Sequence, residues 1–233
     1  MTTAIDGPRL KPASGQTKQL VVFLHGYGAD GNDLIEIGKQ WQNWLPDAAF
    51  VSPHAPEPCG MSPMGRQWFP LTFRDPNERW NGVNSAQPIL DAFLDAELKR
   101  HGLPASQLSL VGFSQGTMMA LHAGLRRKQQ IASILGFSGM LVLPDGAAGL
   151  QRAPQETAFG KPAILLAHGG ADEVIPVEAL FMSADALGAS DIACQWHLSP
   201  EMGHSIDGEG LRQGGLFLMQ NFGLALPETR RKA

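Results

Sequence analysis

Six short segments of this chain are almost continuously apolar, which limits the folds open to it. They are LVVFLH (20–25), AAFVS (48–52), LSLVGF (108–113), IASILGF (131–137), AILLAH (163–168) and IACQWHL (192–198). Strands covered on both faces need such hydrophobicity, and they belong to parallel sheets. Apolar side chains recur at helical spacing over 86–101, 115–128, 176–187 and 209–222. The alternation predicts an α/β fold, a mostly parallel twisted sheet with helices on both faces.

The 233 residues suffice for one substantial core, so residues 1–233 are predicted to form a single domain. The core is predicted to cover about 18–222, and 227–233 are predicted to be a flexible tail. Residues 53–83 are rich in Pro and Gly yet carry four aromatic side chains, so they are predicted to be a long loop on the substrate side. These aromatics either line a pocket or only pin the loop to the body of the protein.

Composition and charge exclude several classes of function. The net charge of −4 gives no sign of an electrostatic nucleic-acid binder. No apolar run approaches the ~18 residues of a membrane span. The N-terminus reads MTTAIDGPRL, unlike a signal peptide, and Cys59 and Cys194 fit free thiols, so we predict a cytoplasmic protein. The scattered histidines give no support to a metal site.

A serine stands where the apolar segment 108–113 leads into a helical pattern. The junction reads G-F-S-Q-G, so Ser114 lies between Gly112 and Gly116 at a strand-to-helix turn. The turn needs these small residues, and it lifts the hydroxyl above the carboxyl edge of the sheet. Ser114 is therefore the predicted nucleophile. Ser138 also follows an apolar segment but lacks the second glycine and a clear helix, so we interpret it as a residue near the pocket rim.

A serine hydroxyl needs a base to accept its proton and an acid to orient that base. After residue 170, His197 lies in an apolar strand pattern, whereas His204 lies in the turn-rich segment SPEMGHSIDGEG, so His204 is the predicted base. Asp172 is the predicted acid because it follows the strand ending at 168 through a short glycine turn. Four other carboxylates compete for this role. Asp145 lies in an ordinary turn, and Asp185 and Asp191 lie in or just after a helical pattern. Glu173 is adjacent to Asp172 but would point elsewhere.

Negative charge on the reacting oxygen needs backbone donors. Gln115 opens the helix after Ser114, and its N–H points from a helix N-terminus toward the site. The second predicted donor is the N–H of Tyr27, in the glycine turn after the first long strand, although neighbouring amides could serve instead. His25 in the same turn is interpreted as a scaffold residue, with a catalytic role as the alternative.

Together these motifs resemble a known family. FLHGYGADGNDL, PHAP, QWF, GFSQGTMMAL, HGGADEVIP and GHSI stand in the order and approximate spacing of the phospholipase/carboxylesterase family, over roughly residues 18–222. That family contains bacterial carboxylesterases and acyl-protein thioesterases. The resemblance implies an α/β-hydrolase fold without a large cap domain and without a cofactor.

The resemblance also implies functional residues. It places a Ser-Asp-His triad at Ser114, Asp172 and His204, and the oxyanion amides at Tyr27 and Gln115. Thioesterase-like members usually carry Leu where this chain has Tyr27, and their Gly-Asp step is interrupted here as Gly28-Ala29-Asp30. The long loop before Trp68 also differs. These departures bear on the acyl preference.

The favoured hypothesis is a serine carboxylesterase that hydrolyses short- to medium-chain esters through an acyl-enzyme. About 25 residues between 137 and 163 are too few for the helical cap of many lipases. The predicted acyl pocket is therefore a shallow apolar site formed by Trp68, Phe69, Phe113, Leu141 and Val174.

Two other functions stay open. An acyl-protein thioesterase or lysophospholipase would need the same triad with a longer apolar channel. A non-catalytic ligand-binding protein on a hydrolase scaffold would not need the full triad. The predicted partner is a small-molecule ester, and a homodimer stays open.

Overall fold

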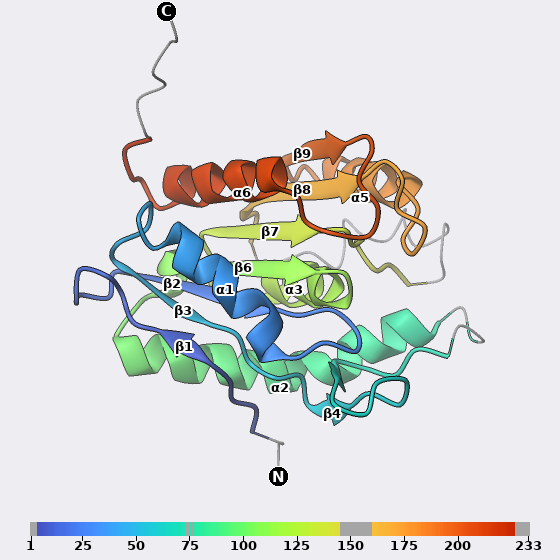
Figure 1. The fold of residues 1–233 in the computed structure, drawn as a ribbon, viewed down its shortest axis with the longest axis horizontal. Coiled ribbons are helices and arrows are strands. Elements are labelled where there is room, and N and C mark those ends of the chain that lie inside the picture. Colours follow the sequence, from blue (N-terminus) through green and yellow to red (C-terminus); the bar gives the residue numbers. More distant parts are fainter. Residues whose placement is uncertain (1–3, 73–74, 76, 145–159, 227–233) are drawn as a thin grey trace, which may run out of the picture.

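The computed structural model describes residues 4–72, 75, 77–144 and 160–226 (Figure 1). The main sheet has seven strands in the order β1-β3-β2-β6-β7-β8-β9. β1 runs antiparallel to β3, and every other neighbouring pair is parallel. The strands are β1 (Arg9–Leu10), β2 (Gln19–Leu24), β3 (Ala48–Val51), β6 (Leu108–Phe113), β7 (Ser133–Phe137), β8 (Ala163–Gly169) and β9 (Cys194–Ser199).

Helices cover both faces of the sheet (Figure 1). The apolar side chains of α1 (Gly31–Trp41) and α6 (Gly208–Asn221) pack on one face. Those of α2 (Glu78–His101), α3 (Gln115–Arg126) and α5 (Glu178–Gly188) pack on the other. The central strands are thus buried on both sides, as their continuous hydrophobicity requires. The predicted α/β fold, a mostly parallel sheet with helices on both faces, is confirmed.

Several elements differ from the sequence-based expectation. Residues 53–83 contain a small antiparallel hairpin, β4 (Glu57–Pro58) with β5 (Arg66–Gln67), and their last residues already belong to α2. The sequence analysis did not predict α1 or β1. The signals for α1 were present: Asp30 caps the helix by accepting from the N–H of Asn32 at 2.8 Å, and Leu34 and Trp41, two turns apart, are buried on the same face.

Parallel strands carry their C-terminal ends to one edge of the sheet. His25 directly follows β2, Ser114 follows β6, and Ser138 follows β7, while Asp172 and His204 lie in the turns after β8 and β9. Chemistry-bearing residues from five strands therefore gather at the edge where open α/β sheets bind ligands. No helix among the described residues is long and apolar enough to cross a membrane.

One buried histidine of the scaffold lacks a polar partner. His122 on α3 is fully buried, and within the described residues neither of its ring nitrogens has a hydrogen-bond partner. Its ring meets Trp80 of α2 edge to face, with centroids 5.4 Å apart. Burial, helped by the charge of Arg126, lowers the pKa of His122 to about 3. The imidazole is neutral in the folded protein.

His122→Leu is expected to stabilise the protein, and more so at acid pH. In the unfolded chain this histidine has its ordinary pKa near 6.5, so between pH 6.5 and 3 only the unfolded state binds the proton. The free energy of unfolding of the wild type therefore decreases as the pH is lowered through that window. At pH 5 this group alone lowers it by about 2 kcal/mol relative to neutral pH. Urea unfolding at pH 5 and pH 8 measures the gain, with His197→Leu on the edge strand β9 as control. An equal gain at both pH values would contradict the assignment.

Candidate active site

Ser114 occupies a strained backbone position between β6 and α3. Its φ of 53° and ψ of −116° lie in a region that residues with a side chain rarely adopt. Such a conformation costs about 1–3 kcal/mol and persists only where the surroundings enforce it. The N–H of Ser114 donates to the carbonyl of Phe137 at 2.9 Å, which ties the turn to the neighbouring strand.

The two flanking glycines are required by close backbone contacts. A Cβ on Gly112 would lie 2.4 Å from the nitrogen of Thr117, and a Cβ on Gly116 would lie 1.8 Å from the carbonyl oxygen of Leu24. Both distances are far below van der Waals contact. The second contact also presses the start of α3 against the end of β2, beside the turn that carries Tyr27.

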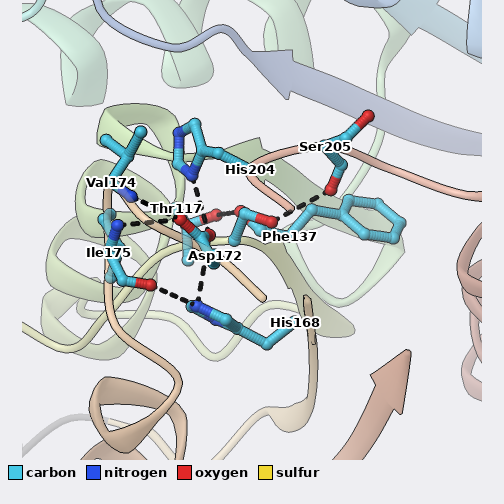
Figure 2. A network of polar contacts seen from close by, with 9 residues as sticks. Thr117, Phe137, His168, Asp172, Val174, Ile175, His204 and Ser205 are labelled. Carbon is cyan, nitrogen blue, oxygen red and sulfur yellow. Dashed lines mark hydrogen bonds and ion pairs between the residues drawn. The ribbon is translucent and has the colours of Figure 1, made fainter. Parts of the chain in front are cut away.

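Asp172 and His204 lie within hydrogen-bond distance of each other (Figure 2). The Nδ1 of His204 is 2.8 Å from the Oδ2 of Asp172. The other carboxylate oxygen, Oδ1, accepts from the N–H groups of Val174 and Ile175, both at 2.9 Å. Burial alone would raise the pKa of Asp172, but the hydrogen bonds from His204, Ile175 and Val174 outweigh it and lower this pKa. Asp172 is thus held as a carboxylate that can orient the ring of His204.

The ring of His204 lies beside the segment that carries Ser114. Its centroid is 5.0 Å from that of Phe113, the residue before Ser114. A hypothetical Cβ on Gly26 would contact Phe113 at 3.1 Å and the Cβ of Ser114 at 3.4 Å. The three predicted triad positions and the turn after β2 therefore converge on one small region.

The sequence analysis missed a second histidine that contacts the same carboxylate. The Nε2 of His168, at the end of β8, lies 2.8 Å from the carbonyl oxygen of Ile175 and 3.3 Å from the Oδ2 of Asp172. A carbonyl oxygen only accepts, so this nitrogen carries the proton and faces both acceptors. His168 thus helps to satisfy the buried carboxylate. Its position four residues before Asp172 was the available signal in the sequence.

In the described part of the chain, the turn after β2 leaves the amides of Gly26 and Tyr27 without an acceptor. The N–H of Gly28 donates to Arg66 O at 2.9 Å and that of Ala29 to Gly26 O at 3.3 Å. Within the described residues, the N–H of Tyr27 donates to no acceptor. The N–H of Gln115 is the first of α3, which a helix leaves without an internal partner. These are the two amides that the sequence predicted as oxyanion donors.

Both ring nitrogens of His25 are hydrogen-bonded to the protein backbone. Its Nε2 accepts from the N–H of Ala55 at 3.0 Å, so its Nδ1 carries the proton and donates to Gly26 O at 2.8 Å. Burial lowers the pKa of His25 to about 4, and the ring is fully buried. Both ring nitrogens are engaged, which favours the scaffold role over the catalytic one.

The five predicted pocket residues occupy different environments. Trp68 and Phe69 are 1% and 0% exposed and belong to the core, so in this structure neither offers surface to a substrate. Leu141 is also buried, whereas Phe113 is half-buried beside His204 and Val174 is 64% exposed. Of the two interpretations of the loop aromatics, pinning to the body describes Trp68 and Phe69.

Gln115 holds these two aromatics in place. Its Oε1 accepts from the N–H of Trp68 at 2.9 Å, and its Nε2 donates to the carbonyl of Phe69 at 2.8 Å. The indole N–H of Trp68 donates to the carbonyl of His25 at 3.0 Å. The aromatic part of the loop is therefore bonded to both segments that carry the candidate oxyanion amides.

The remaining sequence candidates lie elsewhere or are engaged otherwise. Ser138 is fully buried and its hydroxyl donates to the carbonyl of Ser205 at 3.0 Å, so it does not lie at a pocket rim as predicted. His197 lies on the edge strand β9. Asp145 lies outside the described residues. Within the described residues, no cluster of three or more metal-ligating side chains occurs, and both cysteines are free.

Comparison with known proteins assigns the chain to a family. The sequence profile of the family described as Phospholipase/Carboxylesterase matches residues 6–221. The chain belongs to this family. It is 29% identical over 231 residues to acyl-protein thioesterase 1 of Gibberella zeae, covering 94% of this chain and 97% of that one. It is 30% identical over 204 residues to esterase YpfH of Escherichia coli, covering 87% and 81%.

A solved esterase has a similar structure. Esterase PE8 is 41% identical and superposes with a TM-score of 0.87, covering 93% of this chain and 99% of that one. The family resemblance seen in the sequence motifs is thus confirmed. The protein is a hydrolase of the esterase and thioesterase class with an α/β-hydrolase fold.

Asp172→Asn is expected to lower kcat by about 10²–10⁴ with the fold retained. The amide nitrogen would face the Nδ1 of His204 and favour the wrong tautomer of the imidazole. Asp191→Asn is the matched control, because Asp191 is exposed and has a φ of 54°, which Asn tolerates. Steady-state kinetics on a nitrophenyl ester should leave the control within about threefold of wild type. Equal losses in both variants would contradict the predicted role of Asp172.

Proposed function

We propose that this protein is a serine carboxylesterase that acts through an acyl-enzyme on short- to medium-chain esters. The observation that carries the proposal is the Asp172–His204 hydrogen bond beside a strained serine turn. A buried carboxylate that fixes one nitrogen of a histidine leaves the other nitrogen to accept a proton from a serine. Family membership supports the same chemistry.

The proposed reaction has two halves. Ser114 Oγ attacks the ester carbonyl carbon while its proton passes to His204 Nε2, and the N–H groups of Tyr27 and Gln115 stabilise the oxyanion. Collapse breaks the bond to the alcohol oxygen, which takes the proton from His204. Water then attacks the acyl-enzyme with His204 again as base, and the carboxylic acid and free Ser114 result.

The proposed preference for shorter acyl chains rests on the packing near the site. Trp68, Phe69 and Leu141 are engaged in the core, which leaves Phe113 and Val174 of the five pocket candidates with exposed surface. Each buried CH₂ contributes only about 0.8 kcal/mol, so the benefit of a longer chain ends where the apolar contact ends.

A second candidate function has a specific observation in its favour. A relative from Gibberella zeae bears the name acyl-protein thioesterase 1, and the match covers 94% of the present chain. A thioesterase acting on long acyl chains would use the same triad, so the acyl-chain profile distinguishes the two.

Ser114→Ala is expected to lower kcat by about 10⁴–10⁶ and to change stability little. The variant lacks the oxygen that forms the acyl-enzyme, while the buried packing stays the same. A fluorophosphonate probe with mass spectrometry should modify the wild type at Ser114 alone. Labelling at Ser138, or activity that survives in Ser114→Ala, would overturn the proposal.

For nitrophenyl esters, kcat/KM is expected to peak at acyl chains of roughly two to six carbons and to fall beyond about eight. Rates on acyl-CoA thioesters of the same lengths complete the comparison. An optimum at about ten carbons would instead indicate that residues 53–83 move to open a groove. A profile that climbs to palmitoyl on both series would favour the thioesterase function.

A further inference from the structure

The turn after β7, residues 137–139, contacts the segment that carries Ser114. The carbonyl of Phe137 accepts from the N–H of Ser114 and from the hydroxyl of Thr117, both at 2.9 Å. A Cβ on Gly139 would lie 2.3 Å from the Cβ of Thr117 and 2.9 Å from the carbonyl oxygen of Ser114. The turn after β7 therefore packs directly against the strand-to-helix turn at Ser114.

The middle residue of the same turn bonds to the loop that carries His204. The hydroxyl of Ser138 donates to the carbonyl of Ser205 at 3.0 Å, and its N–H donates to Ala167 O at 2.8 Å. Ser138 has a φ of 44° and is fully buried. Figure 2 shows Ser205 and Phe137 close to the Asp172–His204 pair.

Hydrogen bonds hold the His204 loop on two sides. In the described part of the chain, residues 203–206 take part in two of them, one between His204 and Asp172 and one between Ser138 and Ser205, and just before them the carbonyl of Met202 accepts from the N–H of Ala171 at 2.9 Å. The bond to Asp172 fixes one nitrogen of the imidazole. The bond to Ser138 fixes the backbone next to the ring, at Ser205.

We infer that Ser138 is a positioning residue that holds His204 in register with Ser114. The inference rests on the proposed function, which makes these two residues the base and the nucleophile. One short turn bonds to the backbone of Ser114 and to the backbone beside His204, so it sets the distance between them. Glycine would adopt the positive φ without strain, but it has no hydroxyl to offer Ser205.

Loss of the Ser138 hydroxyl should act on the rate and not on substrate binding. A displacement of about 1 Å between reacting groups can cost up to 10²-fold in rate. Ser138→Ala is therefore expected to lower kcat per titrated active site by about 10- to 100-fold while KM stays within about threefold. The rate of fluorophosphonate labelling at Ser114 should fall by a similar factor, because it also depends on proton transfer to His204.

Two further variants separate positioning from stability. Ser138→Gly removes the hydroxyl and relaxes the strained φ, so it should fold even if the alanine variant does not, and it should show the same loss of kcat. Ser133→Ala is the matched control: Ser133 is a fully buried serine of β7 whose hydroxyl lies 2.7 Å from that of Ser109. It should lower the melting temperature yet keep kcat and labelling within about twofold of wild type.

Proton NMR of the imidazole Nδ1–H of His204, the donor to Asp172, gives a readout that needs no substrate. The signal should shift or broaden in both Ser138 variants and stay unchanged in Ser133→Ala. A Ser138 variant with wild-type kcat per titrated site and an unshifted His204 signal would overturn the inference, as would an equal loss in Ser133→Ala. If wild type hydrolyses no ester and Ser114 is not labelled, the proposed function fails, and the NMR comparison still decides the positioning of His204.

Discussion

The contact between the start of α3 and the end of β2 determines how the whole carboxyl edge is arranged. Gly116 lies so close to Leu24 that only a hydrogen atom fits between the two backbones. This contact and the bond from Ser114 to Phe137 O enforce a serine conformation that costs about 1–3 kcal/mol on its own. They also bring the first N–H of α3 beside the turn at Tyr27. The strained serine and the neighbouring positions of the Tyr27 and Gln115 amides thus depend on one packing constraint.

Burial of Asp172 imposes a second constraint on the same edge. A carboxylate without partners in a protein interior is strongly unfavourable, so the surrounding chain must supply donors. Two come from the N–H groups of Val174 and Ile175 and a third is His204, while the Nε2 of His168 lies 3.3 Å from the Oδ2. The turn between β8 and α5 is therefore folded around the carboxylate. Removing one histidine would leave the Asp172 carboxylate with its remaining hydrogen bonds. Removing the carboxylate would leave several buried N–H donors without an acceptor.

Much of this architecture could be predicted from local sequence patterns. The main strands follow from the apolar runs, and Ser114, Asp172 and His204 stand out because each lies in a turn after such a run. The sequence did not reveal the antiparallel β1, because a two-residue strand has no periodicity. Ser138 and His168 were also missed as partners of the site. Their contacts with Ser205 and Asp172 depend on how β7, β8 and β9 are brought side by side.

The burial of Trp68 and Phe69 also changes the argument about substrate length. To open a groove beneath them, the protein would break the two hydrogen bonds with Gln115 and the one with His25 O. Three such bonds contribute about 3–4 kcal/mol in total, and exposing two large aromatics costs several kcal/mol more. An acyl chain repays about 0.8 kcal/mol per buried CH₂, so roughly eight or more methylenes would have to be buried before opening breaks even. The proposed short-chain substrates would not need this rearrangement. The residue that opposes it is Gln115, whose own N–H is a proposed oxyanion donor.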